Sequence, residues 1–219
     1  MRAMPFLSDP LYLNLIRQIP VAQHSVPVRA DFWEAFCAEA GCAELHQTLF
    51  AGAGEIRITR EWLHHAVVSD ELRALAIILW GYPNGGRRGN RHQHWLAHLP
   101  AIARAAAAPL NDWNAYRAGF AGIGGLGIST ISKFACFFGR RFATPGPSGP
   151  LPGLILDRRI LSVLAADRWA ELHPLAMLTY LNAPARYLDY LRSLHDFATH
   201  AGIQPEQLEF FLFVHGDNF

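Results

Sequence analysis

The chain consists mainly of helix-length segments in which apolar residues recur every three to four positions, separated by short stretches rich in glycine and proline. Residues 69–81 show this spacing, from a cap at Ser69 or Asp70 to a stop at Gly81. Residues 29–41 show it too, and the predicted buried face consists of Phe32, Trp33, Phe36 and Ala40. Both segments are therefore predicted to be amphipathic helices.

The same pattern predicts further helices along most of the chain. They cover residues 94–109 with an interruption at Pro100, 111–120 from an Asn111 cap, 128–138, 157–172, 184–202 and 204–216. Strand-like alternation is confined to short pieces such as "EIRIT" at 55–59. The prediction is a mainly α protein, with residues 1–219 forming a single compact helical unit of one or two lobes.

Composition narrows the class of protein. Apolar residues make up 51% of the chain and charged residues 17%, which indicates a globular fold with little scope for disorder. No apolar run is long enough to span a bilayer, and the N-terminal segment lacks a signal-peptide core. Only three cysteines are present, which fits a reducing compartment. We therefore expect a cytoplasmic monomer without a membrane segment.

Cofactors and metals are not indicated. Three cysteines cannot form a four-cysteine iron–sulfur or zinc site unaided. His92 and His94 are too close together on a helix to share a metal, and the adjacent His64 and His65 face different ways. We read His92 and His94 as solvent-facing or as phosphate contacts. The sequence thus predicts no cofactor and no metal site.

Charge is distributed unevenly along the chain. Residues 81–160 contain ten basic and two acidic side chains, a net charge of +8, whereas the flanks together carry −7. Such a basic middle segment indicates a polyanionic partner, most simply double-stranded DNA. The alternative is that these arginines are scattered over a solvated face.

A glycine-rich turn divides two predicted helices in this basic segment. Residues 122–139 read "GIGGLGISTISKFACFFG", and glycines such as Gly125 and Gly127 permit positive φ and close approach of a ligand to the backbone. The second helix would then direct its unpaired N–H groups, with the hydroxyls of Ser129 and Thr130, toward a phosphate. An ordinary turn between helices, with a glycine cap, is the alternative.

The residues that follow this helix-turn-helix segment are also distinctive. A Pro/Gly-rich loop at 139–153 leads into "GLILDRRILSVLA", residues 153–165, with one aspartate before a helix. Over residues 111–166 the chain resembles the helix-hairpin-helix DNA glycosylases, in which the hairpin is followed by a Gly/Pro loop and an aspartate. "GLGIST" with "ILD" looks particularly like the adenine-glycosylase branch. The Gly/Arg loop after "LWGYP" and the C-terminal "LEFFLFVHG" look more loosely like compact bacterial proteins with an 8-oxoguanine-glycosylase fold.

The resemblance implies a role for Asp157. A carboxylate beside C1′ stabilises the oxocarbenium-like state formed as a base leaves, and it can orient or deprotonate the attacking water. Asp157 is the only acid between Trp113 and Ala166, and it begins a predicted helix. Its alternative role is that of a simple N-cap, and the two roles are compatible.

Lys133 is the only lysine of the chain, because all the other basic side chains are arginines. Its amine could attack C1′ and form a Schiff base, which arginine cannot do. It could instead contact the extruded base or a phosphate while Asp157 drives hydrolysis, or it could be an incidental surface lysine. The 8-oxoguanine branch places its lysine where this chain has Ser129, so plain hydrolysis is favoured.

Holding and reading a flipped nucleotide requires further residues. The glycine-rich loop at 82–93 offers wedge and phosphate contacts, with Arg158 beside the candidate aspartate. The predicted contacts of the loop are Asn84, Arg87, Arg88, Asn90 and Arg91, and the alternative is a solvated loop. Candidate walls of a base pocket are Trp80, Tyr82, Trp169 and Phe211, with Tyr180, Phe210 and Phe213 as further aromatics.

Taken together, the sequence predicts a DNA glycosylase that excises a damaged or modified base and leaves an abasic site. The base remains open between an oxidised purine, an adenine opposite a lesion and a hypermodified base such as a substituted cytosine of phage DNA, so DNA repair and antiviral defence are both open. The alternatives are a non-catalytic DNA-binding module that uses the hairpin for phosphate contacts, and a structural helical protein.

Overall fold

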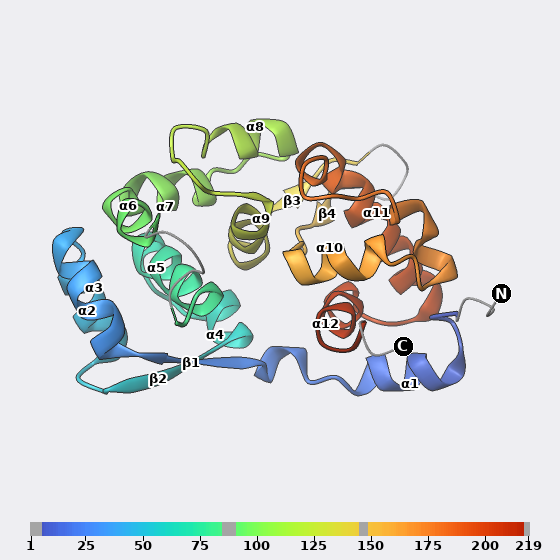
Figure 1. The fold of residues 1–219 in the computed structure, drawn as a ribbon, viewed down its shortest axis with the longest axis horizontal. Helices are drawn as coiled ribbons and strands as arrows, with labels where there is room; N and C mark the ends of the chain where they lie inside the picture. Colours follow the sequence, from blue (N-terminus) through green and yellow to red (C-terminus); the bar gives the residue numbers. More distant parts are fainter. Residues whose placement is uncertain (1–5, 85–90, 145–148, 217–219) are drawn as a thin grey trace.

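The computed structural model describes residues 6–84, 91–144 and 149–216, and it is mainly helical, as the sequence predicted (Figure 1). The helices are α1 (Pro10–Gln18), α2 (Ala30–Glu39), α3 (Ala43–Phe50), α4 (Arg60–His65), α5 (Asp70–Gly81), α6 (Arg91–Ala97), α7 (Leu99–Ala107), α8 (Trp113–Ala118), α9 (Ile128–Phe137), α10 (Arg158–Ala165), α11 (Ala183–Ala201) and α12 (Pro205–His215). Two short 3-10 helices, η1 (Val21–Gln23) and η2 (Ala170–Leu175), join them. No described helix has the length and apolar character needed to cross a membrane.

Two small antiparallel pairs of strands complete the fold. β1 (Ser25–Arg29) pairs with β2 (Glu55–Thr59), the strand predicted at 55–59. The sequence did not predict the partner strand β1, because Pro27 lies in its middle and proline is unusual inside a strand. Proline is tolerated here, opposite Arg57, because both strands of a two-stranded sheet are edge strands. β3 (Arg141–Phe142) and β4 (Leu151–Pro152) close the base of the Pro/Gly loop.

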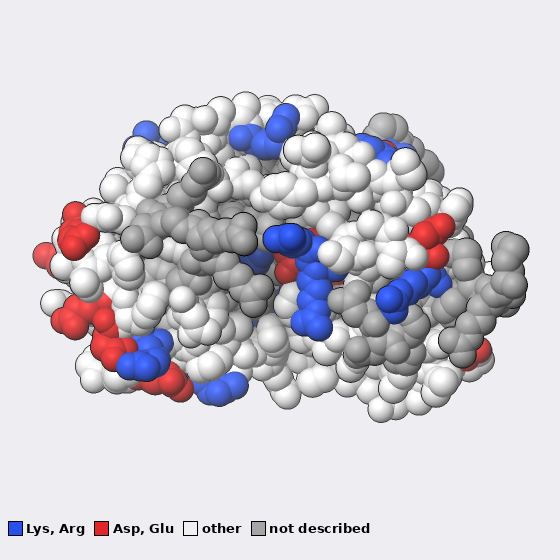
Figure 2. Space-filling model, in the orientation of Figure 1, with Lys and Arg blue, Asp and Glu red and all other residues white. Residues whose placement is uncertain are grey.

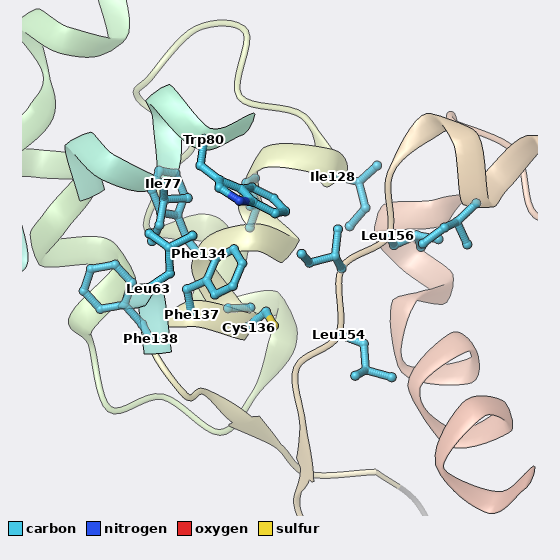
Figure 3. Packing of buried hydrophobic residues seen from close by; sticks show 14 of the residues in the cluster. Leu63, Ile77, Trp80, Ile128, Phe134, Cys136, Phe137, Phe138, Leu154 and Leu156 are labelled. Carbon is cyan, nitrogen blue, oxygen red and sulfur yellow. The ribbon is translucent and has the colours of Figure 1, made fainter. Parts of the chain in front are cut away.

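Helix α9 lies at the centre of the molecule (Figure 1), with α2, α3, α5, α6 and α7 on one side and α10, α11 and α12 on the other. Every side chain from Thr130 to Phe137 is buried, which is the pattern of a helix surrounded by protein. On one side Trp80 of α5 packs edge-on against Phe137, with ring centroids 5.2 Å apart (Figure 3). Residues 154–156 lie on the other side of α9, so this helix joins the two halves of one hydrophobic core.

Three local expectations need correction. The buried face of α2 is formed by Trp33 and Cys37, whereas Phe32 is 38% exposed, because α3 and α6 pack on the Trp33 side. The N-cap of α8 is Asp112, whose carboxylate accepts from the Ala115 N–H, and not Asn111. His92 is buried and not solvent-facing, because it packs edge-on against the rings of Trp33 and Trp95.

Candidate active site

The glycine-rich turn joins α8 to α9 at the position predicted from the sequence. Gly125 has φ +85°, a conformation that a residue with Cβ rarely adopts, and Gly127 is the N-cap of α9. A Cβ on Gly127 would lie 2.1 Å from the hydroxyl of Tyr180, so a glycine is required while that side chain rests there. The turn therefore depends on its glycines for both conformation and space.

Lys133 is buried on α9, one turn after Ser129. Its Nζ donates to the carbonyl oxygen of Ser129 at 3.1 Å and to the Ser129 hydroxyl at 2.9 Å. Burial lowers the pKa of Lys133 below its ordinary value, and the nearby carboxylates of Asp157 and Glu209 partly oppose this. The amine is thus held beside Ser129 at the start of α9, and burial increases the fraction of the amine that is neutral.

Asp157 stands at the start of α10, as predicted. Its Oδ1 accepts hydrogen bonds from the backbone N–H groups of Arg159 and Ile160, at 2.9 and 3.0 Å, and so caps the helix. Among the described residues, its second oxygen, Oδ2, has no hydrogen-bond partner. One carboxylate oxygen therefore fixes the side chain while the other is free to face a ligand.

Each residue of the extended segment 154–156, which leads to Asp157, forms hydrogen bonds with side chains of the core. The Tyr187 hydroxyl accepts from the N–H of Leu154 and donates to its carbonyl, at 3.1 and 2.6 Å, and the Tyr190 hydroxyl donates to the carbonyl of Ile155. The N–H of Leu156 donates to the Ser132 hydroxyl on α9. These bonds satisfy a buried stretch of irregular backbone and place Asp157 relative to α9.

Lys133 and Asp157 line the same cavity, which has a volume of about 260 Å³. Its remaining lining residues come from His24 and β1, from α4, from α5 and the turn that follows α5, from the segment before Asp157, and from α12. They are His24, Val26, Arg60, Trp80, Gly81, Pro83, Ile155, Glu209, Phe210 and Phe213. The cavity thus combines aromatic walls with a carboxylate and an amine, a composition that suits a planar, partly polar ligand.

A buried ion pair lies in this cavity. Arg60 donates to Glu209 at 2.6 Å, and both side chains are almost completely buried. Burial raises the pKa of Glu209 to about 7, against the opposing effect of Arg60. The second oxygen of Glu209 accepts from the N–H of Ile155, so the pair also braces the segment before Asp157.

Two residues that line this cavity carry polar hydrogens without partners. The Nε and Nη1 atoms of Arg60 and the Nε1 atom of Trp80 are buried, and none has a hydrogen-bond partner in the described structure. The Arg60 guanidinium also lies 5.9 Å from the Trp80 ring centroid and 5.5 Å from that of Phe210. Unpaired buried donors are costly, so a ligand that supplies acceptors would be favoured here.

The aromatic residues predicted to form a base pocket separate into two groups. Trp80 lines the cavity, as do Phe210 and Phe213, whereas Trp169 and Phe211 pack against each other elsewhere in the core with centroids 5.9 Å apart. Phe211 points away because adjacent positions on a helix are turned about 100° from each other, so Phe211 leaves the cavity where Phe210 faces it. Tyr82 is not among the lining residues either, since its hydroxyl bonds that of Thr130 at 2.7 Å.

The predicted DNA contacts are only partly described. Arg87, Arg88 and Asn90 lie outside the described residues. Arg91 begins α6, but its side chain is also outside them. Asn84 and Arg158 are exposed, whereas Thr130 is buried and engaged with Tyr82. Figure 2 shows basic atoms at the centre of one face, over the start of α10, and acidic atoms mainly over the end formed by α2 and α3.

Sequence reasoning missed His24, Arg60 and Glu209. Glu209 did leave a signal, because it is the single charge in the otherwise apolar "LEFFLF" of residues 208–213, and such a charge is rarely buried without a partner. Its partner Arg60 is 149 positions away, and nothing in the surrounding sequence marks it.

Comparison with models of protein families gives a match over most of the chain. A model of the family described as "Putative 8-oxoguanine DNA glycosylase OGG-like protein" matches residues 19–213, a range that includes every residue lining the cavity. Searches of curated proteins and of solved structures found no match.

Proposed function

The chain belongs to this OGG-like 8-oxoguanine DNA glycosylase family, and on that premise we propose that it is a DNA N-glycosylase with Asp157 as its essential carboxylate. The observation that carries the proposal is the position of Asp157, which lines one cavity with Lys133. Its Oδ1 caps α10, and its Oδ2 has no partner among the described residues. A base within a duplex cannot reach such a site, so the nucleotide must flip out of the helix.

The chemistry follows from the free carboxylate oxygen. As the bond between C1′ and the base nitrogen breaks, the electron pair leaves with the base and positive charge develops on the sugar. The Asp157 carboxylate stabilises that charge, and it accepts a proton from the water whose oxygen bonds to C1′. The departing base takes up a proton, and the product is an abasic site.

The turn between α8 and α9 is proposed to hold the DNA as a helix-hairpin-helix. Gly125 and Gly127 allow a phosphate close to the backbone, and the first N–H groups of α9 with the Ser129 hydroxyl point to the same place. Arg158 on α10 supplies a cation close to Asp157. The loop residues Asn84, Arg87, Arg88 and Arg91 remain the proposed contacts to the opened duplex.

The unpaired donors of two residues that line the cavity are proposed to read the base once the side chains adjust to it. Arg60 and Trp80 offer N–H groups without partners, so the excised base should present carbonyl or ring-nitrogen acceptors. An oxidised purine meets this requirement and is our lead substrate, with a substituted cytosine of phage DNA as the alternative. The test is mass spectrometry of bases released from unmodified, oxidised, alkylated and hypermodified DNA, and the proposal fails if no base is released from any of them.

Trp80→Phe tests the proposed reading of the base. This change keeps the aromatic wall and removes the Nε1 donor, so we expect release of the base to slow by about 5- to 30-fold, the value of one buried hydrogen bond. Trp33→Phe is the matched control, because its Nε1 is equally buried and unpartnered but lies outside the cavity. Single-turnover release rates would compare the two. Equal effects in both variants would contradict a role for Trp80 in recognition.

A second chemistry is favoured by the burial of Lys133 in the same cavity. Its amine nitrogen would bond to C1′ as the bond to the base breaks and the electron pair leaves with the base. The nitrogen would then lose its protons as the C1′–O4′ bond opens and O4′ becomes a hydroxyl, and borohydride would reduce the resulting imine to a stable protein–DNA adduct. Because burial lowers the pKa of Lys133, we expect the adduct yield to rise with pH and to level off below the ordinary value of 10.5. Denaturing gels measure the adduct.

Lys133→Gln is the matched control for this chemistry, since no other lysine side chain can replace it. An adduct that disappears in Lys133→Gln assigns the Schiff base to this residue. Base release without any adduct in the native protein assigns the reaction to water and Asp157 alone.

A further inference from the structure

Three side chains of different chemistry meet one helical turn along α9 from Lys133, outside the cavity of the candidate active site. They are His64 on α4, Cys136 on α9 and Glu206 on α12, and their donor atoms all lie within 4.8 Å of one another. The Cys136 sulfur is 4.0 Å from His64 Nε2, which is 3.5 Å from a Glu206 carboxylate oxygen. Among the described residues this is the only such group of three potential metal ligands.

Two of the three distances are close to those required by one zinc ion. Tetrahedral zinc with Zn–S of about 2.3 Å and Zn–N of about 2.0 Å separates the sulfur and nitrogen by about 3.6 Å and the nitrogen and oxygen by about 3.3 Å. The observed sulfur–nitrogen and nitrogen–oxygen separations exceed these by a few tenths of an ångström. The sulfur and the Glu206 oxygen, which lie within 4.8 Å of each other, would have to approach by up to about 1.2 Å, through rotation of the Glu206 side chain. Thiolate, imidazole and carboxylate are also the three ligand types that zinc uses in proteins.

Charge and access also fit a divalent cation. A Cys136 thiolate and the Glu206 carboxylate together balance two positive charges, and the neighbouring Arg60 is already paired with Glu209. His64 and Glu206 line a second cavity, of about 580 Å³, which leaves a path for the ion and room for water as fourth ligand. His65 and His195 line the same cavity.

The cluster is connected to the candidate active site through three helices. His64 lies four residues after Arg60 on α4, Cys136 three after Lys133 on α9, and Glu206 three before Glu209 on α12. Each helix thus carries one residue of each site, one turn apart. An ion bound to the cluster would fix these helices relative to one another.

We propose that His64, Cys136 and Glu206 form a zinc site that holds α4, α9 and α12 together beneath the candidate active site. On binding, the sulfur bonds to the metal and the thiol proton passes to solvent, while His64 binds through Nε2 and keeps its proton on Nδ1. Water occupies the fourth position. The site is independent of the proposed base excision, since none of its ligands lines the catalytic cavity.

Cobalt replaces zinc as the spectroscopic probe in the test. The full-length protein, stripped with a chelator, would be titrated with Co²⁺, and a sulfur-to-cobalt charge-transfer band with intense tetrahedral visible bands is expected at one equivalent. Zn²⁺ should then displace the cobalt. Calorimetry with Zn²⁺ should give one site, weakened by more than about 100-fold in Cys136→Ala or His64→Gln.

Cys37→Ala is the control for the sulfur, because Cys37 is another buried free cysteine, and it should leave the cobalt bands unchanged. Zinc should also raise the melting temperature of the native protein and of Cys37→Ala, but not that of Cys136→Ala. The proposal is wrong if no charge-transfer band forms in the native protein, or if the band is lost with Cys37 and not with Cys136. In either case the cluster is only a packed thiol beside a His–Glu pair.

Discussion

Asp157→Asn is expected to reduce base release by at least about 10³-fold while DNA binding is retained, because the change removes the negative charge that faces the developing cation. Asparagine is as good an N-cap as aspartate, so α10 should keep its start and the protein its stability. The loss should therefore appear in the single-turnover rate and not in the melting temperature. The measurement is release of the base identified by mass spectrometry.

Asp112→Asn is the matched control for this variant. Asp112 caps α8 through one carboxylate oxygen as Asp157 caps α10, but it does not line the cavity. It should release the base at the native rate. If Asp157→Asn also keeps that rate, Asp157 is an N-cap only and the proposed mechanism fails. Tight, salt-sensitive duplex binding without base release by the native protein would instead identify a non-catalytic DNA-binding module.

Tyr187→Phe is expected to have the largest effect on stability, lowering the free energy of unfolding by about 2–4 kcal/mol. The Tyr187 hydroxyl is fully buried and serves both the N–H and the carbonyl of Leu154, so its removal leaves two buried backbone groups without a partner. Because Leu154 precedes Asp157 by three residues, base release should slow as well. Urea unfolding gives the first quantity and single-turnover kinetics the second.

Two other buried tyrosines provide comparisons for the loss of unfolding free energy in Tyr187→Phe. Tyr190 makes one bond in the same segment, to the carbonyl of Ile155 at 2.8 Å, and Tyr190→Phe should cost about 1–2 kcal/mol. Tyr116 makes only a long bond of 3.5 Å to Ala106, and its replacement by phenylalanine should cost less. A loss in Tyr187→Phe no larger than that in Tyr116→Phe would show that the hydroxyl does not support the segment.

Local sequence signals determined most of the helices because they depend on neighbouring residues only. Ser69 caps α5 and Gly202, at φ +64°, ends α11 as predicted, since a cap needs only the right side chain, or its absence, at a helix end. The same holds for the Asp157 cap and for the one-turn spacing that brings Lys133 onto Ser129. The resemblance in residues 111–166 was therefore carried by segments whose geometry is local.

Tertiary structure alone decided which side chains line the cavity together and which meet in buried pairs and clusters. Phe210 and Phe211 are equally aromatic and adjacent, yet only the packing of α12 against α10, α11 and η1 turns Phe210 toward the cavity and Phe211 into the core. Arg60 meets Glu209, and His64 meets Cys136 and Glu206, across long separations in the chain. Burial of charge is a property of the assembled core and not of any window of sequence. The sequence thus determined the helices and the candidate carboxylate and amine, and the packing of α4, α9 and α12 decided what surrounds them.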